Sequence, residues 1–173
     1  ARCIPPLLEG KDLIGIAQTG TGKTAAYLLP MLSVLCEQPH PQDAVNCLIM
    51  SPTRELAQQI DQALQGFAYY TRTNSVAVYG GNDGIRFEQE RKAFAQGADI
   101  IVATPGRLIS HLQLGNLDLS RTTHIILDEA DRMLDMGFFD DIMTIIKQLP
   151  AHRQTILFSA TMPPEIAKMA REV

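Results

Sequence analysis

The 173-residue sequence has no tryptophan, three cysteines and no apolar run near the length of a membrane span. Because a helix needs about 20 mostly apolar residues to cross a bilayer, the sequence predicts no transmembrane segment. The first residues also predict no signal peptide. The cysteines, Cys3, Cys36 and Cys47, are odd in number and lack metal-ligand spacing. We therefore expect buried or partly buried thiols and a cytoplasmic location.

Positive charge is scarce as well. Fifteen Lys and Arg residues against 19 Asp and Glu residues give a net charge of −4 and a pI of about 5.5. A chain of this kind is not expected to hold nucleic acid through a general basic surface. A small site made of a few cations and backbone donors is compatible with this charge. The four histidines are scattered, so we expect them to be structural or solvent-facing.

Short apolar runs alternate with helical patterns along the whole chain. The runs are apolar on both faces, which is typical of strands in a parallel sheet covered by helices. The length corresponds to about one domain, so residues 1–173 are predicted to form a single α/β domain with helices on both faces of a mostly parallel sheet. The predicted strands are 12–16, 47–50, 75–79, 99–103, 124–127 and 155–158, and the predicted helices are 23–36, 55–68, 85–95, 108–112, 138–149 and one from 163.

Several side chains on these helices carry structural expectations. Pro30 lies inside the first helix and is expected to end or kink it. The charged side chains of helix 85–95 are expected to form a solvated face: Arg86, Glu88, Glu90, Arg91 and Lys92. Four later side chains are expected to pack in the core: Met133, Met136, Phe138 and Phe139.

A glycine-rich turn joins the first strand to the first helix. A strand, a turn ending in Gly-Lys-Thr and a helix form the context of a phosphate-binding loop. In such a loop, backbone N–H groups and the helix N-terminus face the phosphates. Lys23 can reach the terminal phosphates and the Thr24 hydroxyl can ligate Mg²⁺. The predicted loop is Ala17, Gln18, Thr19, Gly20, Thr21, Gly22, Lys23 and Thr24, with Ala17 where the general motif has glycine.

Two acidic residues, Asp128 and Glu129, follow the apolar run 124–127. With a phosphate loop upstream, a carboxylate at this position would hold Mg²⁺, and the next one could orient or deprotonate the attacking water. The alternative is an acidic helix start that only favours the helix dipole. The phosphate loop favours the catalytic interpretation.

Further polar and glycine motifs follow the other predicted strands. Ligands of parallel sheets bind beyond the carboxyl ends of the strands. Each motif alone could be a turn or a helix cap, but together they predict one functional edge. They are Pro52-Thr53-Arg54-Glu55, Gly80-Gly81, Thr104-Pro105-Gly106-Arg107 and Ser159-Ala160-Thr161.

These motifs, with Asp128-Glu129-Ala130-Asp131, carry a family resemblance. From about Gly10 to Thr161 the sequence resembles the N-terminal RecA-like domain of a DEAD-box ATP-dependent RNA helicase, whose phosphate loop commonly begins with alanine. The resemblance implies ATP and Mg²⁺ as cofactors and RNA as partner. It implies that Lys23 and Asp128 serve the triphosphate and the metal, and that Glu129 serves the hydrolytic water.

The resemblance implies two further sets of residues. Asp131 would contact Ser159 and Thr161 and couple the nucleotide site to RNA remodelling. The RNA backbone would lie along Pro52, Thr53, Arg54, Gly80, Gly81, Thr104, Gly106 and Arg107. Such groups suit phosphates and 2′-hydroxyls and carry no base code, so RNA binding should be independent of sequence.

The family also has parts that residues 1–173 do not contain. An aromatic residue and a glutamine that read adenine would precede the phosphate loop, and a second RecA-like domain would supply an arginine finger. The chain alone is therefore expected to be monomeric, to bind ATP or ADP weakly, to hydrolyse ATP negligibly and not to unwind RNA. The alternatives are a non-catalytic nucleotide-dependent RNA clamp or scaffold, and a DNA helicase or metabolic kinase, against which the D-E-A-D and S-A-T elements weigh.

Overall fold

The computed structural model describes residues 2–17, 23–37, 44–69, 71, 73–80 and 84–173. Part of the predicted site lies outside these residues. The predicted phosphate-loop residues Gln18, Thr19, Gly20, Thr21 and Gly22 and the predicted RNA-contacting residue Gly81 belong to that part.

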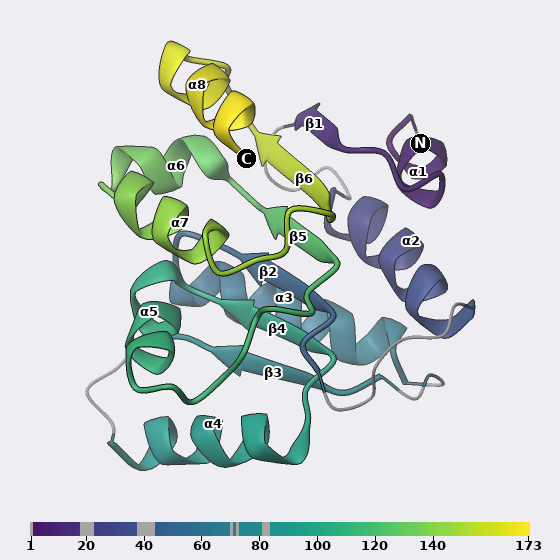
Figure 1. Cartoon of the computed structure of the whole chain (residues 1–173). Helices are drawn as coiled ribbons and strands as arrows, with labels where there is room; N and C mark the ends of the chain where they lie inside the picture. Colours follow the sequence, from purple (N-terminus) through teal and green to yellow (C-terminus); the bar gives the residue numbers. More distant parts are fainter. Residues whose placement is uncertain (1, 18–22, 38–43, 70, 72, 81–83) are drawn as a thin grey trace.

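A six-stranded sheet forms the centre of the domain (Figure 1). Its strands are β1 (Leu13–Ile16), β2 (Cys47–Met50), β3 (Ser75–Val78), β4 (Ile100–Ala103), β5 (His124–Leu127) and β6 (Gln154–Ser159). Their spatial order is β1-β6-β5-β2-β4-β3, and every neighbouring pair is parallel. The predicted parallel sheet is confirmed.

Helices cover both faces of the sheet (Figure 1). One hydrophobic cluster joins the sheet to side chains of α1, α2 and α3, and the other joins it to side chains of α5, α6, α7 and α8. The helices are α1 (Ile4–Leu8), α2 (Lys23–Glu37), α3 (Arg54–Phe67), α4 (Gly84–Gln96), α5 (Pro105–Gln113), α6 (Ala130–Asp135), α7 (Phe139–Ile146) and α8 (Pro164–Glu172).

Strand β2 shows why the apolar runs become buried strands. Its alternate side chains point to opposite faces of the sheet. Leu48 and Met50 therefore pack in the α5–α8 cluster, whereas Cys47 and Ile49 pack in the α1–α3 cluster. A strand covered on both sides needs apolar residues at every position, and all four residues of β2 are buried.

Pro30 is expected from the sequence to end or kink the first helix. It does not end α2, which continues to Glu37, because the buried face around Tyr27 and Met31 outweighs one missing hydrogen bond; the kink stays a prediction. Two other expectations about individual side chains are wrong. Met136 is exposed rather than in the core, since it follows the last turn of α6. Cys36, in the last turn of α2, is also exposed.

Four other side chains are buried or partly buried, as expected. Met133 is buried, and Phe138 and Phe139 are partly buried against the same cluster. Cys47 is buried, and burial raises the pKa of its thiol. Among the residues that the structure describes, no helix combines the length and apolar character needed to cross a bilayer.

Candidate functional site

The carboxyl ends of the parallel strands bring the described residues of the predicted motifs to one edge of the sheet. The strand order divides this edge into two halves. The half at β1, β6 and β5 carries Ala17, Ser159 and Asp128, and the Ala17 N–H donates to the Ser159 carbonyl at 3.0 Å. The half at β2, β4 and β3 carries the motifs predicted to contact RNA. The Asp128 N–H joins the halves by donating to the Met50 carbonyl at 2.9 Å.

Lys23 and Asp128 form a buried ion pair at the first half. Lys23 begins α2 and Asp128 directly follows β5. Lys23 Nζ lies 2.8 Å from Asp128 Oδ1, and their side chains are 6% and 0% exposed. Charged groups are rarely buried this deeply unless they are paired or bind a ligand. The structure thus brings together two of the residues that the sequence assigned to triphosphate and metal.

Tyr27 supports this pair and was not foreseen from the sequence. Its hydroxyl donates to Asp128 Oδ2 at 2.9 Å. Burial, together with the nearby charge of Asp128, raises the pKa of Tyr27 well above its ordinary value, so the hydroxyl stays protonated and acts as a donor. The sequence feature that could have indicated this contact is the four-residue spacing of Lys23 and Tyr27, because residues four apart lie on the same face of a helix.

A close approach of β1 and β6 fixes the ring behind Tyr27. Phe158 packs against Tyr27 with ring centroids 5.5 Å apart. A Cβ atom on Gly15 would lie 2.5 Å from Phe158 Cε1. Only glycine therefore fits at this point of β1 without moving the aromatic ring.

Glu129 adopts a backbone conformation that is rare for its residue type. Its φ and ψ angles are 52° and 51°, in the left-handed region, and it is the only non-glycine residue with positive φ among those described. Its carboxylate oxygens lie 3.9 Å from Lys23 Nζ and 3.5 Å from Arg132 Nη1. Backbone strain of this kind clusters at functional sites, so the turn that aims this carboxylate is a candidate catalytic feature.

Asp131 contacts the segment after β6. The Thr161 hydroxyl donates to Asp131 Oδ2 at 3.0 Å. Partial burial acts to raise the pKa of Asp131, but hydrogen bonds from Thr161, from the Arg132 backbone N–H and from Ser159 outweigh it and lower the pKa. Ser159 does not cap the last helix, since α8 starts after Pro163.

The donor set around Asp128 fits a divalent cation shared with phosphates. Mg²⁺ is commonly held by one or two carboxylates, substrate phosphates and water. Asp128 Oδ1 is buried and accepts no well-aligned hydrogen bond from a described residue, although Lys23 is close. The Thr24 hydroxyl approaches the same Tyr27 hydroxyl that Asp128 contacts. The described residues contain no cluster of three or more potential ligands that would hold a metal by itself.

The second half of the edge is built from helix starts and turns. Thr53 caps α3 by accepting a hydrogen bond from the Leu56 N–H at 3.2 Å, and Arg54 begins the helix. Thr104 precedes α5, and its side chain makes no capping hydrogen bond. Gly80 follows β3 after Tyr79, whose ring centroid lies 6.0 Å from the Arg54 guanidinium carbon. Pro52 is buried, Gly106 is exposed and Arg107 is partly buried.

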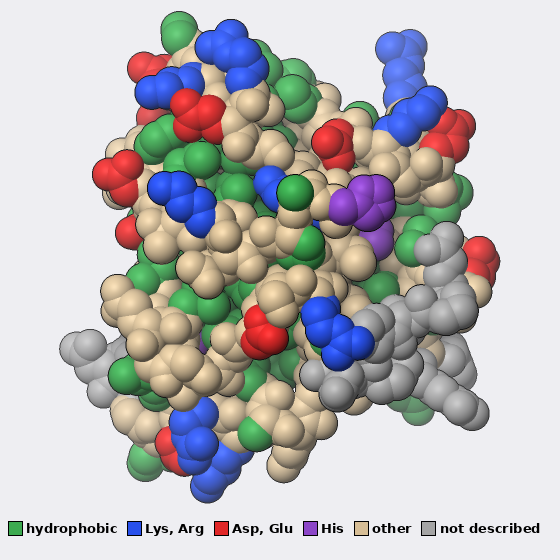
Figure 2. Space-filling view, in the orientation of Figure 1, with side chains coloured by type: hydrophobic (Ala, Val, Ile, Leu, Met, Phe, Trp, Pro, Cys, Tyr) green, Lys and Arg blue, Asp and Glu red, His purple; other side chains and the backbone are tan. Residues whose placement is uncertain are grey.

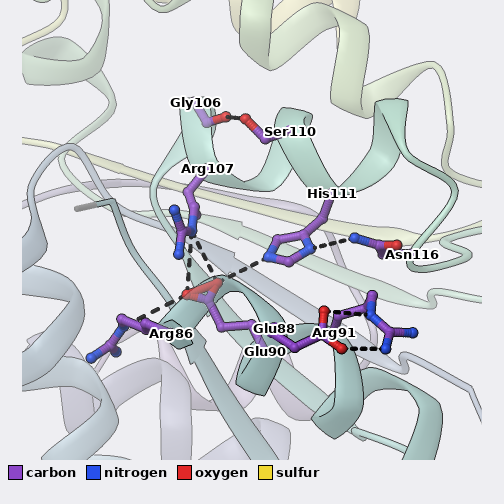
Figure 3. Close-up of polar contacts among 9 residues, drawn as sticks. All are labelled: Arg86, Glu88, Glu90, Arg91, Gly106, Arg107, Ser110, His111 and Asn116. Carbon is purple, nitrogen blue, oxygen red and sulfur yellow. Dashed lines mark hydrogen bonds and ion pairs between the residues drawn. The ribbon is translucent and has the colours of Figure 1, made fainter. Parts of the chain in front are cut away.

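The expectation of a solvated face on α4 is wrong for Glu90. Glu90 is 4% exposed, and its carboxylate contacts Arg107 Nε at 3.1 Å and His111 Nε2 at 2.9 Å (Figure 3). Glu88 and Arg91 do pair with each other on the half-exposed side of the helix. The overlooked signal is the spacing of Phe87, Glu90 and Phe94, which places Glu90 on the buried face of α4.

Charges of both signs are interspersed over the face seen in Figure 2, without an extended basic surface. This distribution agrees with the net charge of −4. Any contact with nucleic acid on this face would therefore depend on local groups rather than on a broad positive field.

Comparison with known proteins identifies the family. The chain belongs to the DEAD/DEAH box helicase family, whose model matches residues 1–169. It is 49% identical over 172 residues to the ATP-dependent RNA helicase DeaD of Escherichia coli (strain K12), covering 99% of this chain and 26% of DeaD. It is 47% identical over 168 residues to the ATP-dependent RNA helicase CshA of Listeria monocytogenes, covering 97% of this chain and 31% of CshA.

A solved structure gives the same result for the fold. The crystal structure of the yeast DEAD-box splicing factor Prp28 matches with a TM-score of 0.88 and 33% identity, over 97% of this chain and 41% of that chain. The predicted RecA-like α/β fold is confirmed. The chain spans about a quarter of the length of DeaD, with 26% covered.

Proposed function

We propose that this chain is the ATP- and RNA-backbone-binding part of a longer ATP-dependent RNA helicase. The whole protein would couple ATP hydrolysis to local opening of RNA duplexes. The observation that carries the proposal is the buried Lys23–Asp128 pair at 2.8 Å, on the same sheet edge as Thr53 and Thr104. The names of DeaD and CshA, both ATP-dependent RNA helicases, support the same activity.

The nucleotide would bind at the half of the edge formed by β1, β6 and β5. A triphosphate with its metal presents an anion to Lys23 and a cation to Asp128, so it complements the two charges that the site holds together. The loop from Ala17 to Thr24 would supply backbone donors. Asp128 and the Thr24 hydroxyl would hold Mg²⁺, which would neutralise charge on the phosphates.

Glu129 would orient and deprotonate the water that attacks the terminal phosphate. Its strained backbone and its 3.9 Å distance from Lys23 Nζ place the carboxylate next to the group that would bind that phosphate. The hydrogen bond from Thr161 to Asp131 would connect this half of the site to the segment after β6. A change in the nucleotide could then reach the RNA through Ser159 and Thr161.

The RNA backbone would follow the half of the edge formed by β2, β4 and β3. The hydroxyl of Thr104, which makes no capping hydrogen bond, and the guanidinium groups of Arg54 and Arg107 suit phosphates and 2′-hydroxyls. Pro52, Thr53, Gly80, Gly81 and Gly106 would complete this path. Since none of these groups reads a base edge, we expect binding to be independent of RNA sequence.

A steady-state ATPase assay of the full-length protein tests this function. We expect single-stranded RNA to stimulate ATP turnover, and DNA of the same sequence and length to stimulate it much less. Equal stimulation by DNA would contradict RNA as the substrate. No turnover with either, despite ATP binding, would support a non-catalytic clamp instead. The 173-residue chain alone is expected to be monomeric and to turn over ATP negligibly. In the cell, we propose a cytoplasmic location.

A further inference from the structure

A buried carboxylate on α4 contacts two arginines at the RNA-facing half of the edge. Glu90 Oε2 lies 3.1 Å from Arg107 Nε, and Glu90 Oε1 lies 3.6 Å from Arg86 Nε. Arg107 lies in the first turn of α5 and Arg86 in the first turn of α4, after the neighbouring strands β4 and β3. One acidic side chain therefore connects two cations that come from different strand ends (Figure 3).

His111 fixes the orientation of the Glu90 carboxylate. A carboxylate can only accept hydrogen bonds, so His111 Nε2 carries a proton and donates to Glu90 Oε2 at 2.9 Å. The other ring nitrogen, Nδ1, accepts from the Asn116 side-chain amide at 3.0 Å. The imidazole stacks on Phe87 with centroids 3.9 Å apart. The Glu90 carboxylate is thus hydrogen-bonded to an imidazole ring whose own position is fixed by Asn116 and Phe87.

The two arginines are exposed to different degrees. The Arg107 side chain is 11% exposed, and its guanidinium carbon lies 4.7 Å from the Phe87 ring centroid. The Arg86 side chain is 36% exposed, and its guanidinium carbon lies 3.8 Å from the Tyr79 ring centroid. Asp61 of α3 also faces Arg86. The partly exposed Arg86 side chain therefore lies over the Tyr79 ring, and its Nε atom stays close to the Glu90 carboxylate.

We propose that Glu90 is a positioning residue that holds Arg107 and Arg86 side by side for the phosphates of an RNA backbone, with Arg86 as an additional RNA contact. This inference rests on the proposed function, because it takes Arg107 as an RNA-binding residue. Guanidinium groups bind phosphate through a fixed fork of donors. Holding the forks in place before RNA binds reduces the ordering that binding requires.

The direction in which Glu90→Gln changes RNA affinity separates a positioning role from a general electrostatic effect. Glu90→Gln removes a negative charge near the RNA, so unspecific electrostatics alone would strengthen RNA binding. If Glu90 positions the two guanidinium groups, the same substitution weakens binding, by about tenfold for one lost charge-assisted hydrogen bond. Glu88→Gln is the matched control. It removes the same charge from the same helix at a half-exposed site, and we expect it to leave RNA affinity unchanged or slightly higher.

The experiment measures RNA affinity of the full-length protein by fluorescence anisotropy at several salt concentrations, together with ATPase turnover at varied ATP and RNA. Glu90→Gln should raise the KM for RNA and leave the KM for ATP unchanged. Arg86→Ala should weaken RNA binding and reduce the slope of log affinity against log salt by about 0.7, the value for one contact to a single strand. Adding Glu90→Gln to the double variant Arg86→Ala/Arg107→Ala should have no further effect on affinity.

The outcomes test the RNA contact of Arg107 and the positioning role of Glu90 separately. If Arg107→Ala leaves RNA affinity unchanged, the RNA contact that the proposed function assigns to Arg107 is wrong. If Arg107→Ala weakens binding but Glu90→Gln does not, or if Glu90→Gln still acts without both arginines, the positioning role is wrong. Should Glu90→Gln fail to fold, as thermal unfolding would show, the surface variant Arg86→Ala decides, and an unchanged salt slope would overturn the inference.

Discussion

Replacing Lys23 with methionine should destabilise the chain even without nucleotide or Mg²⁺. The substitution keeps an unbranched apolar stem and removes the ammonium that lies 2.8 Å from Asp128. Because Asp128 is completely buried, its carboxylate would keep the Tyr27 hydroxyl but lose its cation. Breaking a buried ion pair on one side costs about 3–5 kcal/mol. For a domain of this size, that lowers the unfolding midpoint by roughly 6–20 °C.

A double-mutant cycle isolates the effect of the unpaired Asp128 charge on stability. Urea unfolding of Lys23→Met, Asp128→Asn and the double variant would be measured without ligands. Asp128→Asn removes the uncompensated charge, so the double variant should be more stable than Lys23→Met alone. Lys11→Met is the control, because Lys11 pairs with Glu9 at an exposed position and such pairs contribute about 0–1 kcal/mol.

Two results would refute this reasoning. One is a loss of less than about 1 kcal/mol in Lys23→Met, comparable to an exposed pair. The other is a double variant no more stable than Lys23→Met, since the destabilisation would then come from lost packing of the lysine stem rather than from an unpaired carboxylate.

Three further predictions concern the residues around this pair. Gly15→Ala should destabilise the chain by about 1–3 kcal/mol through overpacking, and Phe158→Leu should relieve part of that loss in denaturant unfolding; independent effects would count against the contact. Glu129→Gly should be more stable than Glu129→Ala by about 1 kcal/mol, since only glycine adopts the left-handed conformation without strain; equal stabilities would contradict this. Asp131→Asn should be less stable than the wild type at pH 7. Because the pKa of Asp131 is lowered on folding, the difference should shrink below about pH 3.9, its ordinary unfolded value. A difference that widens in acid during pH-dependent thermal unfolding would exclude the assigned hydrogen bonds.

Local sequence pattern was enough to predict the sheet. A parallel strand buried on both faces must be apolar throughout, so runs such as 47–50 and 124–127 could be placed at the observed bounds of β2 and β5. A second rule, that ligands bind beyond the carboxyl ends of parallel strands, predicted that the motifs after the strands would share one edge of the sheet. Short helices gave a weaker pattern, and neither α1 nor α6 was predicted as a separate helix.

Tertiary contacts explain what the sequence pattern missed. Glu90 looked like one more charge on a polar helix, and its burial depends on Arg107 and His111, which lie 17 and 21 residues away. Tyr27 belongs to no recognised motif, and its role depends on Asp128, 101 residues away. The sequence motifs identified the groups expected to touch ligands, whereas the groups that hold them in place became visible only in the folded chain.

The most direct test of a hydrolytic site at this sheet edge is to measure RNA-stimulated ATP turnover by the full-length protein with Glu129→Gln. The substitution keeps the size of the side chain and removes the carboxylate that would act on the water. We predict that turnover falls by at least about 100-fold, the lower range for loss of a general base, while binding of ATP and of RNA stays close to that of the wild type. Turnover within a few fold of the wild type would contradict the account of this sheet edge as a hydrolytic site.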